Sequence, residues 1–359
     1  MNKKKKYFTV KDLQLVERGA DYIFLLGERA NGKSYSVKSK TITEAFNSIK
    51  DGMCERQIAY IRRFDLDVKD SVTEPYFADV PVQEITKNQY STISVFRKRI
   101  YFANYDENTQ KVVRGVCIGQ CFALSSAEHY KSLMFPRIQN LIFEEVISEK
   151  NQYLTSQEPQ RLQQLVSTIL RDRKGKVYLI GNTLSRMCPY YVEYGLKGCE
   201  DIELGCTKTY KIDNTVIKVH RCNTANYNSG MFFGRAKKNI TEGEYLTNSQ
   251  PHLDGKLEDY NIIHTIVLEY DNFKYLMQFL YNPKDCYYVW YVSPKTTPIK
   301  SDTRVISNQF NPSPYYTNDM IGINELEKRA LAFIELKKVV FSDNLTGTEF
   351  YSIIDKLDT

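Results

Sequence analysis

Short apolar runs alternate with helical segments along the first half of the chain. Residues 21–26 (DYIFLL) form an apolar run that ends at Gly27, which predicts a buried strand. The stretch from Lys33 to about Ile49 has helical character and stops at Asp51-Gly52, so it predicts a helix. Strand, glycine-containing loop and helix therefore form the first predicted unit.

The same alternation continues to about residue 180. Strands are predicted at residues 57–63, 92–103, 111–118, 138–143 and 176–180, and a helix at residues 159–170. The second and third of these strands are expected to form a hairpin that turns at residues 106–108. Strands separated by helices predict an α/β domain with a mostly parallel sheet, here assigned to residues 1–200.

The pattern changes after about residue 198, where Gly, Asn, Thr and Lys predominate, and we interpret residues 201–250 as a linker region. A smaller α+β domain is expected over residues 251–359. Its predicted strands are residues 262–268, 275–281 and 287–292, with a turn at residues 282–285 and a closing helix at residues 324–340.

Length and composition agree with two soluble domains. A chain of 359 residues fits two domains of roughly 100–200 residues each. No apolar run approaches the roughly 20 residues of a membrane-spanning helix, and the N-terminal lysines precede no signal-peptide core. The eight cysteines include no C-x-x-C pair, which favours reduced thiols in a cytosolic protein.

The charge is unevenly distributed. Residues 1–200 hold 31 basic and 23 acidic residues, a net charge of +8, residues 201–250 carry +2, and residues 251–359 carry −4. The basic half suggests a polyanionic partner such as nucleic acid, with a solvated lysine surface as the alternative. Whether Lys3–Lys6 is functional or only solubilising stays open.

Residues 27–34 fit the phosphate-binding pattern G-x-x-x-x-G-K-[ST]. Gly27 and Gly32 let the backbone wrap a phosphate, and the following helix adds the positive end of its dipole. Lys33 is expected to reach the β and γ phosphates of ATP, and the Ser34 hydroxyl to bind Mg²⁺. The alternative is an incidental surface loop, but the strand before it and the helix after it favour the functional interpretation.

Two glutamates end the predicted strand at residues 138–143. In P-loop hydrolases, an acidic residue at this place holds the Mg²⁺ shell and a neighbouring carboxylate activates the attacking water. We therefore assign the metal role to Glu144 and the catalytic role to Glu145. Glu144 is one methylene longer than the usual Asp, so we expect coordination through a shifted carboxylate or through a water. The competing interpretation is that both glutamates only begin a helix.

A basic cluster, Arg171-Asp172-Arg173-Lys174, precedes the strand that ends near Asn182. An arginine from a neighbouring subunit can stabilise the transition state, and an Asn at a strand end can sense the γ-phosphate. Sequence does not distinguish such a finger from a solvated helix end, nor Arg171 from Arg173.

Together these segments resemble the genome-packaging ATPases of the Bacillus phage phi29 type, relatives of the large terminase subunits. The resemblance runs from the loop at Gly27 through residues 58–63, 131–136, 141–145 and 170–173 to residues 182–190, and it covers roughly the first 195 residues well. Arg29 inside the loop is also a feature of terminase-like ATPases.

The resemblance implies a P-loop ATPase of the ASCE type. Such proteins assemble as a ring, usually a homopentamer, on the portal of a viral procapsid in the host cytoplasm and drive double-stranded DNA inward. Lys131 and Arg171 match positions that act in trans, and Asn182 matches the sensor. The resemblance also implies that the C-terminal domain is an RNase H-like nuclease that has lost its metal ligands. The subunit number, the surface that grips DNA and a structural RNA bridging to the portal stay open.

Three alternatives remain at this point. The first is a P-loop kinase or another phosphotransferase, and the second is a non-enzymatic DNA-binding or capsid-assembly protein with a degenerate loop. The third is a terminase with an active nuclease, for which a two-metal site needs about three or four converging carboxylates. The acids available in the second domain are Glu269, Asp271, Asp285 and Asp302.

Overall fold

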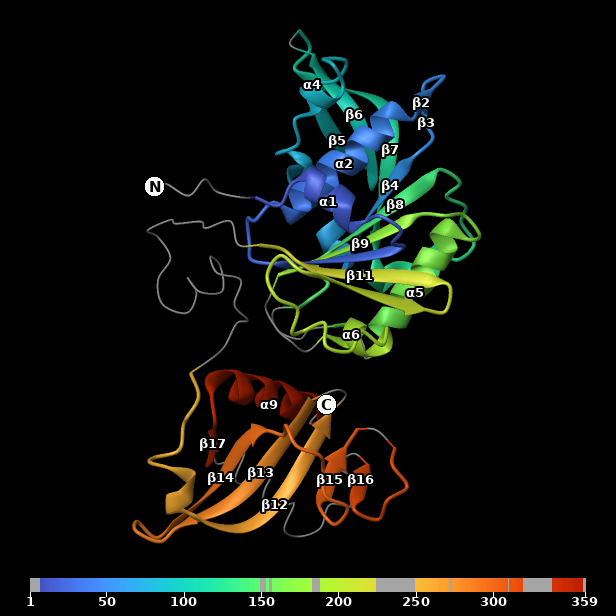
Figure 1. The fold of residues 1–359 in the computed structure, drawn as a ribbon. Helices are drawn as coiled ribbons and strands as arrows, with labels where there is room; N and C mark the ends of the chain where they lie inside the picture. Colours follow the sequence, from blue (N-terminus) through green and yellow to red (C-terminus); the bar gives the residue numbers. More distant parts are fainter. Residues whose placement is uncertain are drawn as a thin grey trace. The chain divides into compact units, whose positions relative to one another are not determined.

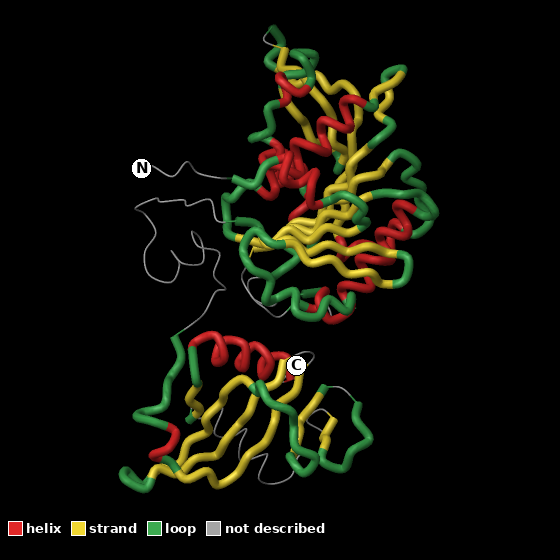
Figure 2. Tube along the Cα trace, viewed as in Figure 1, coloured by secondary structure: helices red, strands yellow, loops and turns green. Residues whose placement is uncertain are grey.

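The computed structural model divides into two compact units, residues 1–244 and 245–359. The structure describes residues 7–106, 108–148, 153–154, 157–182, 188–223, 249–270, 273–308, 310–318 and 338–357. Figure 1 shows the course of the chain through both units, and Figure 2 shows their helices and strands.

Within the described residues, nine strands of the first unit form one sheet. In spatial order they are β10 (Thr207–Ile212), β11 (Thr215–Arg221), β1 (Tyr22–Gly27), β9 (Lys176–Asn182), β8 (Ile138–Glu144), β4 (Gln57–Arg62), β7 (Lys111–Ala123), β6 (Arg99–Asp106) and β5 (Thr92–Phe96). The strands from β11 to β7 run parallel, and β10, β6 and β5 are antiparallel to their neighbours. The predicted α/β domain with a mostly parallel sheet is confirmed.

The helices cover both faces of this sheet (Figure 1). The remaining elements are α1 (Val10–Val16), α2 (Lys33–Asn47), β2 (Ile49–Lys50), β3 (Met53–Cys54), η1 (Asp65–Val68), α3 (Asp70–Thr73), η2 (Glu74–Phe77), α4 (Val82–Ile85), η3 (Leu124–Tyr130), α5 (Glu158–Leu170) and α6 (Pro189–Glu193). Alternate residues of the central strands face opposite sides: Phe24 and Leu26 join the core under α5 and α6, and Ile23 and Leu25 join the core under α1 and α2. Two cores therefore hold the sheet between them, as parallel sheets require.

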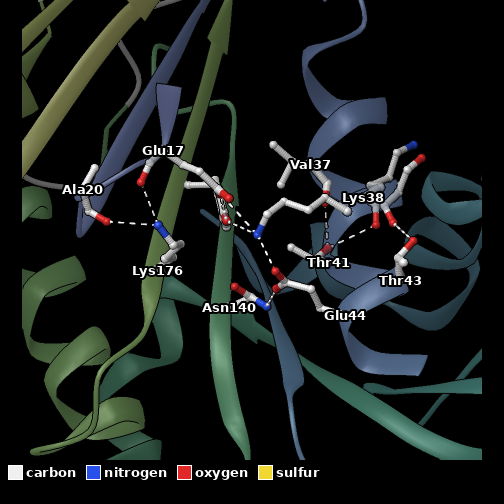
Figure 3. A network of polar contacts seen from close by, with 12 residues as sticks. Glu17, Ala20, Val37, Lys38, Thr41, Thr43, Glu44, Asn140 and Lys176 are labelled. Atoms are coloured by element: carbon white, nitrogen blue, oxygen red, sulfur yellow. Dashed lines mark hydrogen bonds and ion pairs between the residues drawn. The ribbon is translucent and has the colours of Figure 1, made fainter. Parts of the chain in front are cut away.

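A buried polar network fixes α2 to the sheet (Figure 3). The Lys40 ammonium of α2 lies between the carboxylates of Glu17 (3.2 Å) and Glu44 (2.8 Å) and donates to the Tyr178 hydroxyl at 3.0 Å. On the strands, Asn140 donates to Glu44 at 2.9 Å and the Lys176 ammonium donates to the Glu17 carbonyl at 2.8 Å. These bonds fix the orientation of α2, which begins directly after the glycine-rich loop.

A second buried pair connects β4 to α5. The Arg63 guanidinium donates from Nε to both oxygens of Glu158, at 3.0 and 2.9 Å, and Glu158 has no exposed surface. The Tyr190 hydroxyl donates to the same carboxylate at 2.8 Å, and Arg63 also donates to the Val146 carbonyl at 3.3 Å. The Arg63–Glu158 pair therefore connects three segments: the start of α5, helix α6, and the chain after β8.

One predicted strand of the first unit differs from the structure. The predicted strand 92–103 is two strands, because Arg97 and Lys98 adopt left-handed backbone (φ +49° and +60°) and form a tight turn. Asp70 accepts from both of their amides, at 2.7 and 2.9 Å, and so stabilises a turn that no glycine marks.

The predicted linker at residues 201–250 is wrong for its first part. β10 and β11 form a hairpin that joins the main sheet, and β11 pairs in parallel with β1. Ile217 and Val219 are buried in this sheet, and their burial outweighs the polar composition of the segment. Residues 224–248 lie outside the described part of the chain.

The second unit contains a six-stranded mixed sheet among its described residues (Figure 1). Its elements are η4 (Leu257–Asp259), β12 (Asn261–Tyr270), β13 (Phe273–Asn282), β14 (Tyr287–Pro294), β15 (Arg304–Ser307), β16 (Tyr316–Asn318), β17 (Val339–Phe341) and α9 (Asn344–Leu357). β12, β13 and β14 form the antiparallel meander that the sequence predicts, and β15, β16 and β17 add parallel pairs at its two sides. α9 packs on the sheet, where Tyr275 donates to Glu349 at 2.7 Å.

The closing helix predicted at residues 324–340 is wrong at its end. Val339 and Val340 belong to β17, because they pair with Trp290 and Tyr291 of β14. Residues 324–337 lie outside the described part. All eight cysteines are described and are free thiols. Among the described helices, none combines the length and apolar composition needed to cross a membrane.

The buried Arg63–Glu158 pair leads to a stability prediction. Glu158→Gln should lower the free energy of unfolding of the first unit by about 3 kcal/mol, since it leaves a buried guanidinium without its counter-charge. Urea denaturation followed by circular dichroism measures this loss. The control is Glu55→Gln, which breaks an exposed pair with Arg137 and should leave the urea midpoint unchanged. Equal midpoints for the two variants would contradict the assignment.

Candidate functional site

The predicted phosphate-binding loop lies between β1 and α2, at the carboxyl edge of the parallel strands. Gly32 is the N-cap residue of α2 and has φ +98°. A Cβ at this position would lie 2.5 Å from the Phe8 carbonyl oxygen, so the loop needs glycine here both for its backbone and for space. The following 15-residue helix directs its free N–H groups at the loop, which favours an anion.

The Lys33 side chain turns back into this loop. Its ammonium donates to the carbonyl oxygens of Gly27 (3.3 Å) and Glu28 (2.6 Å) and to Asn182 Oδ1 (3.0 Å). Lys33 is 4% exposed, and no carboxylate of the described residues forms an ion pair with it. Burial lowers the pKa of Lys33, with smaller opposing effects from Cys222 and Glu144. A buried cation that has only neutral acceptors favours the arrival of an anion.

The N-terminal segment encloses one side of the loop. The Phe8 amide donates to the Asn31 carbonyl at 2.8 Å, and the Phe8 carbonyl accepts from the Ser36 hydroxyl at 2.8 Å. Together with the loop and the ends of β8 and β9, this segment lines a cavity of about 760 Å³. The Asn31 side-chain amide has a buried Nδ2 with no hydrogen-bond partner beside this cavity, which a ligand acceptor would satisfy.

Glu144 ends β8 and lines the same cavity. The residue is 9% exposed, and its carboxylate accepts from the Tyr76 hydroxyl at 2.7 Å. Burial raises the pKa of Glu144, and hydrogen bonds from Tyr76 and Ser34 oppose that shift. The predicted metal pair, Ser34 and Glu144, therefore lies at one cavity, to which α2 and β8 each bring one residue. A hydroxyl and a carboxylate oxygen are ligands that Mg²⁺ accepts, so these residues fit the ion.

Glu145 follows in a left-handed conformation (φ +61°), which turns its side chain away from the strand direction. Its carboxylate accepts from Arg62 Nη2 at 2.7 Å and is largely exposed toward the cavity. Arg62 ends β4, the strand beside β8. The structure thus brings the predicted catalytic glutamate to the cavity and pairs it with a guanidinium.

Of the other predicted nucleotide-binding residues, Asn182 and Arg29 both line the cavity. Asn182 ends β9 opposite Gly27, with its Oδ1 on the Lys33 ammonium. Arg29 lies exposed at the tip of the loop.

The predicted trans-acting residues lie elsewhere. Lys131 follows η3 and pairs with Glu128 at 2.5 Å, while Arg171 follows α5 and donates weakly to the Leu133 carbonyl at 3.5 Å. Lys131 precedes β8 and Arg171 precedes β9. Both residues therefore lie on the side of the amino ends of these strands, whereas the carboxyl ends of the same strands line the cavity. Neither residue lines the cavity of its own subunit.

Arg173 has a structural role. Its guanidinium donates to the carbonyls of Phe135 (2.7 Å), Pro136 (2.6 Å), Ile138 (3.0 Å) and Ile169 (2.5 Å). These bonds fasten the end of α5 to the chain that enters β8. The Arg173 guanidinium is occupied within its own unit, whereas the Arg171 side chain makes one long hydrogen bond among those described.

Two residues of the site carry no motif. Arg62 contacts Glu145, and Tyr76 contacts Glu144. The strand order of the sheet places β4, which carries Arg62, beside β8, and Tyr76 lies in η2, which follows β4 in the chain. The position of Arg62 at the end of a predicted strand was an available signal, because carboxyl ends of parallel strands meet at one edge. Tyr76 has no comparable signal.

The acids of the second unit do not form a metal site in the described part. Glu269 pairs with Lys274 at 2.7 Å, and Asp285 accepts from Asn282 at 3.2 Å. Among the described residues, no group of three or more His, Cys, Asp or Glu side chains is arranged to hold a metal ion. Asp271 lies outside these residues.

Comparison with known proteins places this arrangement in a family. Residues 1–237 match the family model described as Podovirus DNA encapsidation protein (Gp16). A DNA packaging protein of Bacillus phage B103 is 29% identical over 175 residues, which are 48% of this chain and 47% of that protein. The DNA packaging protein of Bacillus phage phi29 is 28% identical over the same length, 48% of this chain and 46% of that protein. The match thus spans about half the length of these relatives.

Two solved structures share this fold at low sequence identity. The bacteriophage Phi-29 viral genome packaging motor assembly superposes with a TM-score of 0.58 at 19% identity, covering 98% of this chain and 99% of that one. The Phi-28 gp11 DNA packaging motor superposes with a TM-score of 0.51 at 17% identity, covering 99% of each chain. The chain belongs to the Podovirus DNA encapsidation protein family, which confirms the resemblance that its motifs indicate.

The crowded position of Gly32 leads to a binding prediction. Gly32→Ala should weaken binding of a fluorescent ATP analogue about tenfold or more, because the new Cβ displaces the loop from Phe8. Gly52→Ala is the matched control, since Gly52 also has positive φ (+74°) but open space around it. Titration of the analogue measures both affinities. Equal affinities for the two variants would show that the loop does not hold the nucleotide.

Proposed function

We propose that this protein is an ATP-driven translocase that packages double-stranded DNA into a viral procapsid. The observation that carries the proposal is the buried Lys33 ammonium inside a glycine loop, beside the Ser34–Glu144 pair and Glu145. Membership of the encapsidation family supports the packaging role. The net charge of +8 on residues 1–200 suits contact with DNA phosphates without reading of sequence.

The chemistry follows from the positions of the side chains. The loop amides and Lys33 bind the β and γ phosphates, and Asn182 contacts the same ammonium from β9. Mg²⁺, held by Ser34 and Glu144, would neutralise the phosphate charge. Glu145 accepts a proton from the water that attacks the γ-phosphorus, and the bond to the ADP oxygen breaks. For this step Glu145 has to leave Arg62, with which it is paired at 2.7 Å.

A ring of subunits supplies the missing positive charge. The position of Arg171 and Lys131 near the amino ends of the strands supports a role at the site of a neighbouring subunit, where a guanidinium stabilises the transition state. The engagement of Arg173 with four carbonyls favours Arg171 as that residue. We expect a homopentamer docked on the procapsid portal in the host cytoplasm, with a structural RNA as a further candidate partner.

For the second unit we propose an RNase H-like fold without nuclease activity. Its meander of three antiparallel strands, extended by parallel strands, is compatible with that fold. The ion pair of Glu269 with Lys274 and the scatter of the described acids support inactivity.

A phosphotransferase is the second candidate. The glutamate pair favours hydrolysis instead, because Glu145 lies at the cavity where an attacking water would need a base. Phosphoryl transfer to small acceptors, compared with ATPase stimulation by DNA, separates the two activities.

The role of Glu145 is testable by a conservative substitution. In the presence of procapsids and DNA, Glu145→Gln should lower the kcat for ATP hydrolysis about 100-fold or more and leave KM for ATP nearly unchanged, since only the proton acceptor is lost. Glu84→Gln, an exposed glutamate of α4, is the control and should match the wild type. Wild-type kcat in the Glu145→Gln protein would remove Glu145 from the mechanism.

The role of Arg171 is testable by mixing subunits. Arg171→Ala should fold normally yet lose ATPase activity about 1000-fold or more, whereas Arg173→Ala should lower the melting temperature. Mixing Arg171→Ala subunits with Lys33→Ala subunits should restore activity, because some interfaces then join an intact loop to an intact arginine. No recovery on mixing would argue against a trans role.

A further inference from the structure

Tyr76 makes a contact in the site that no motif of the chain explains. It lies in η2, distant in sequence from both the glycine-rich loop and β8. Its hydroxyl donates to Glu144 Oε1 at 2.7 Å, and Glu144 is buried, so water does not compete for this bond. Ser34 of the loop lines the same cavity as this carboxylate. Glu144 is thus held by a tyrosine at the cavity that the serine of the loop also lines.

The Tyr76 ring is itself firmly held. It packs on Tyr60 of β4 at a centroid distance of 4.5 Å and on Phe77 at 4.9 Å. The buried Lys38 ammonium lies 4.4 Å above the ring centroid, donates to the Tyr76 carbonyl at 2.6 Å, and pairs with Asp79. Lys38 comes one turn after Ser34 on α2, so the helix that carries the loop serine also positions the tyrosine.

The hydrogen bond from Tyr76 compensates for the extra length of Glu144, which stands where an aspartate is usual. A glutamate has one more rotatable bond than an aspartate, and ordering that bond costs free energy unless a contact fixes it beforehand. A phenol is suited to the task, because it donates one hydrogen bond and carries no charge. It orients the carboxylate without neutralising it, whereas a lysine or arginine would compete with a divalent cation.

We propose that Tyr76 is a positioning residue for the metal-binding carboxylate. By holding Oε1, it keeps Glu144 in the orientation that directs the remaining coordination sites toward Ser34 and the cavity. The inference rests on the proposed function, because it takes Mg²⁺ with ATP as the ligand of this cavity. Partners of this kind typically change metal affinity 10- to 100-fold when they are removed.

The test is Tyr76→Phe in the full-length protein, which keeps the ring and its packing and removes only the hydroxyl. Mg²⁺ is titrated into protein with a fluorescent ATP analogue, and the fluorescence gives the apparent Mg²⁺ affinity. We expect Tyr76→Phe to weaken that affinity about tenfold and to leave binding of the analogue in EDTA unchanged. Tyr90→Phe is the matched control, since Tyr90 stacks on Phe102 of β6 and should keep wild-type values.

A second background distinguishes positioning from packing. In Glu144→Asp protein the shorter carboxylate no longer reaches the tyrosine, so adding Tyr76→Phe should cause no further loss of Mg²⁺ affinity. A tenfold loss in both backgrounds would overturn the proposal, as would equal Mg²⁺ affinity of Tyr76→Phe and Tyr90→Phe. If the wild type itself binds the analogue without any dependence on Mg²⁺, the proposed function fails as well, so the two failures are distinguishable.

Discussion

The ammonium of Lys33, buried at the end of β1 and surrounded by neutral oxygens, is the constraint on which the site depends. Burial of a positive charge is costly unless acceptors surround it, and Gly27, Glu28 and Asn182 provide them. Those acceptors come from the loop and from β9, so β1 and β9 have to pair in register, with Gly27 opposite Asn182. The arrangement stabilises the cation while leaving it ready for an anionic ligand.

The carboxyl ends of four parallel strands bring the remaining groups to that cation. Because consecutive side chains point to opposite faces, Arg62 at the end of β4 and Arg63 directly after it serve different faces of the sheet. Arg62 holds the Glu145 carboxylate beside the cavity, and Arg63 anchors α5 through the buried carboxylate of Glu158. The Glu145 carboxylate and the framework under α5 are therefore held by two adjacent arginines.

Much of the first unit is predictable because local patterns agree with the tertiary structure. The apolar runs of β1, β4, β8 and β9 and the helical segments of α2 and α5 are strong signals, since each is buried along most of its length. The hairpin of β10 and β11 was missed because its polar composition resembles a loop, and its burial comes only from pairing with β1. The turn at Arg97-Lys98 was missed because Asp70, distant in sequence, stabilises it.

By itself, the sequence determined the chemistry of the site: a glycine loop with Lys33 and Ser34, a strand ending in two glutamates, and Asn182 at another strand end. These features are local, and their spacing suffices to recognise them. Only the tertiary structure decided which groups touch, namely Tyr76 on Glu144, Arg62 on Glu145, and Arg173 on backbone carbonyls. Such contacts depend on strand order and on turns between strands, which bring distant residues within hydrogen-bond distance and leave no periodic signal in the chain.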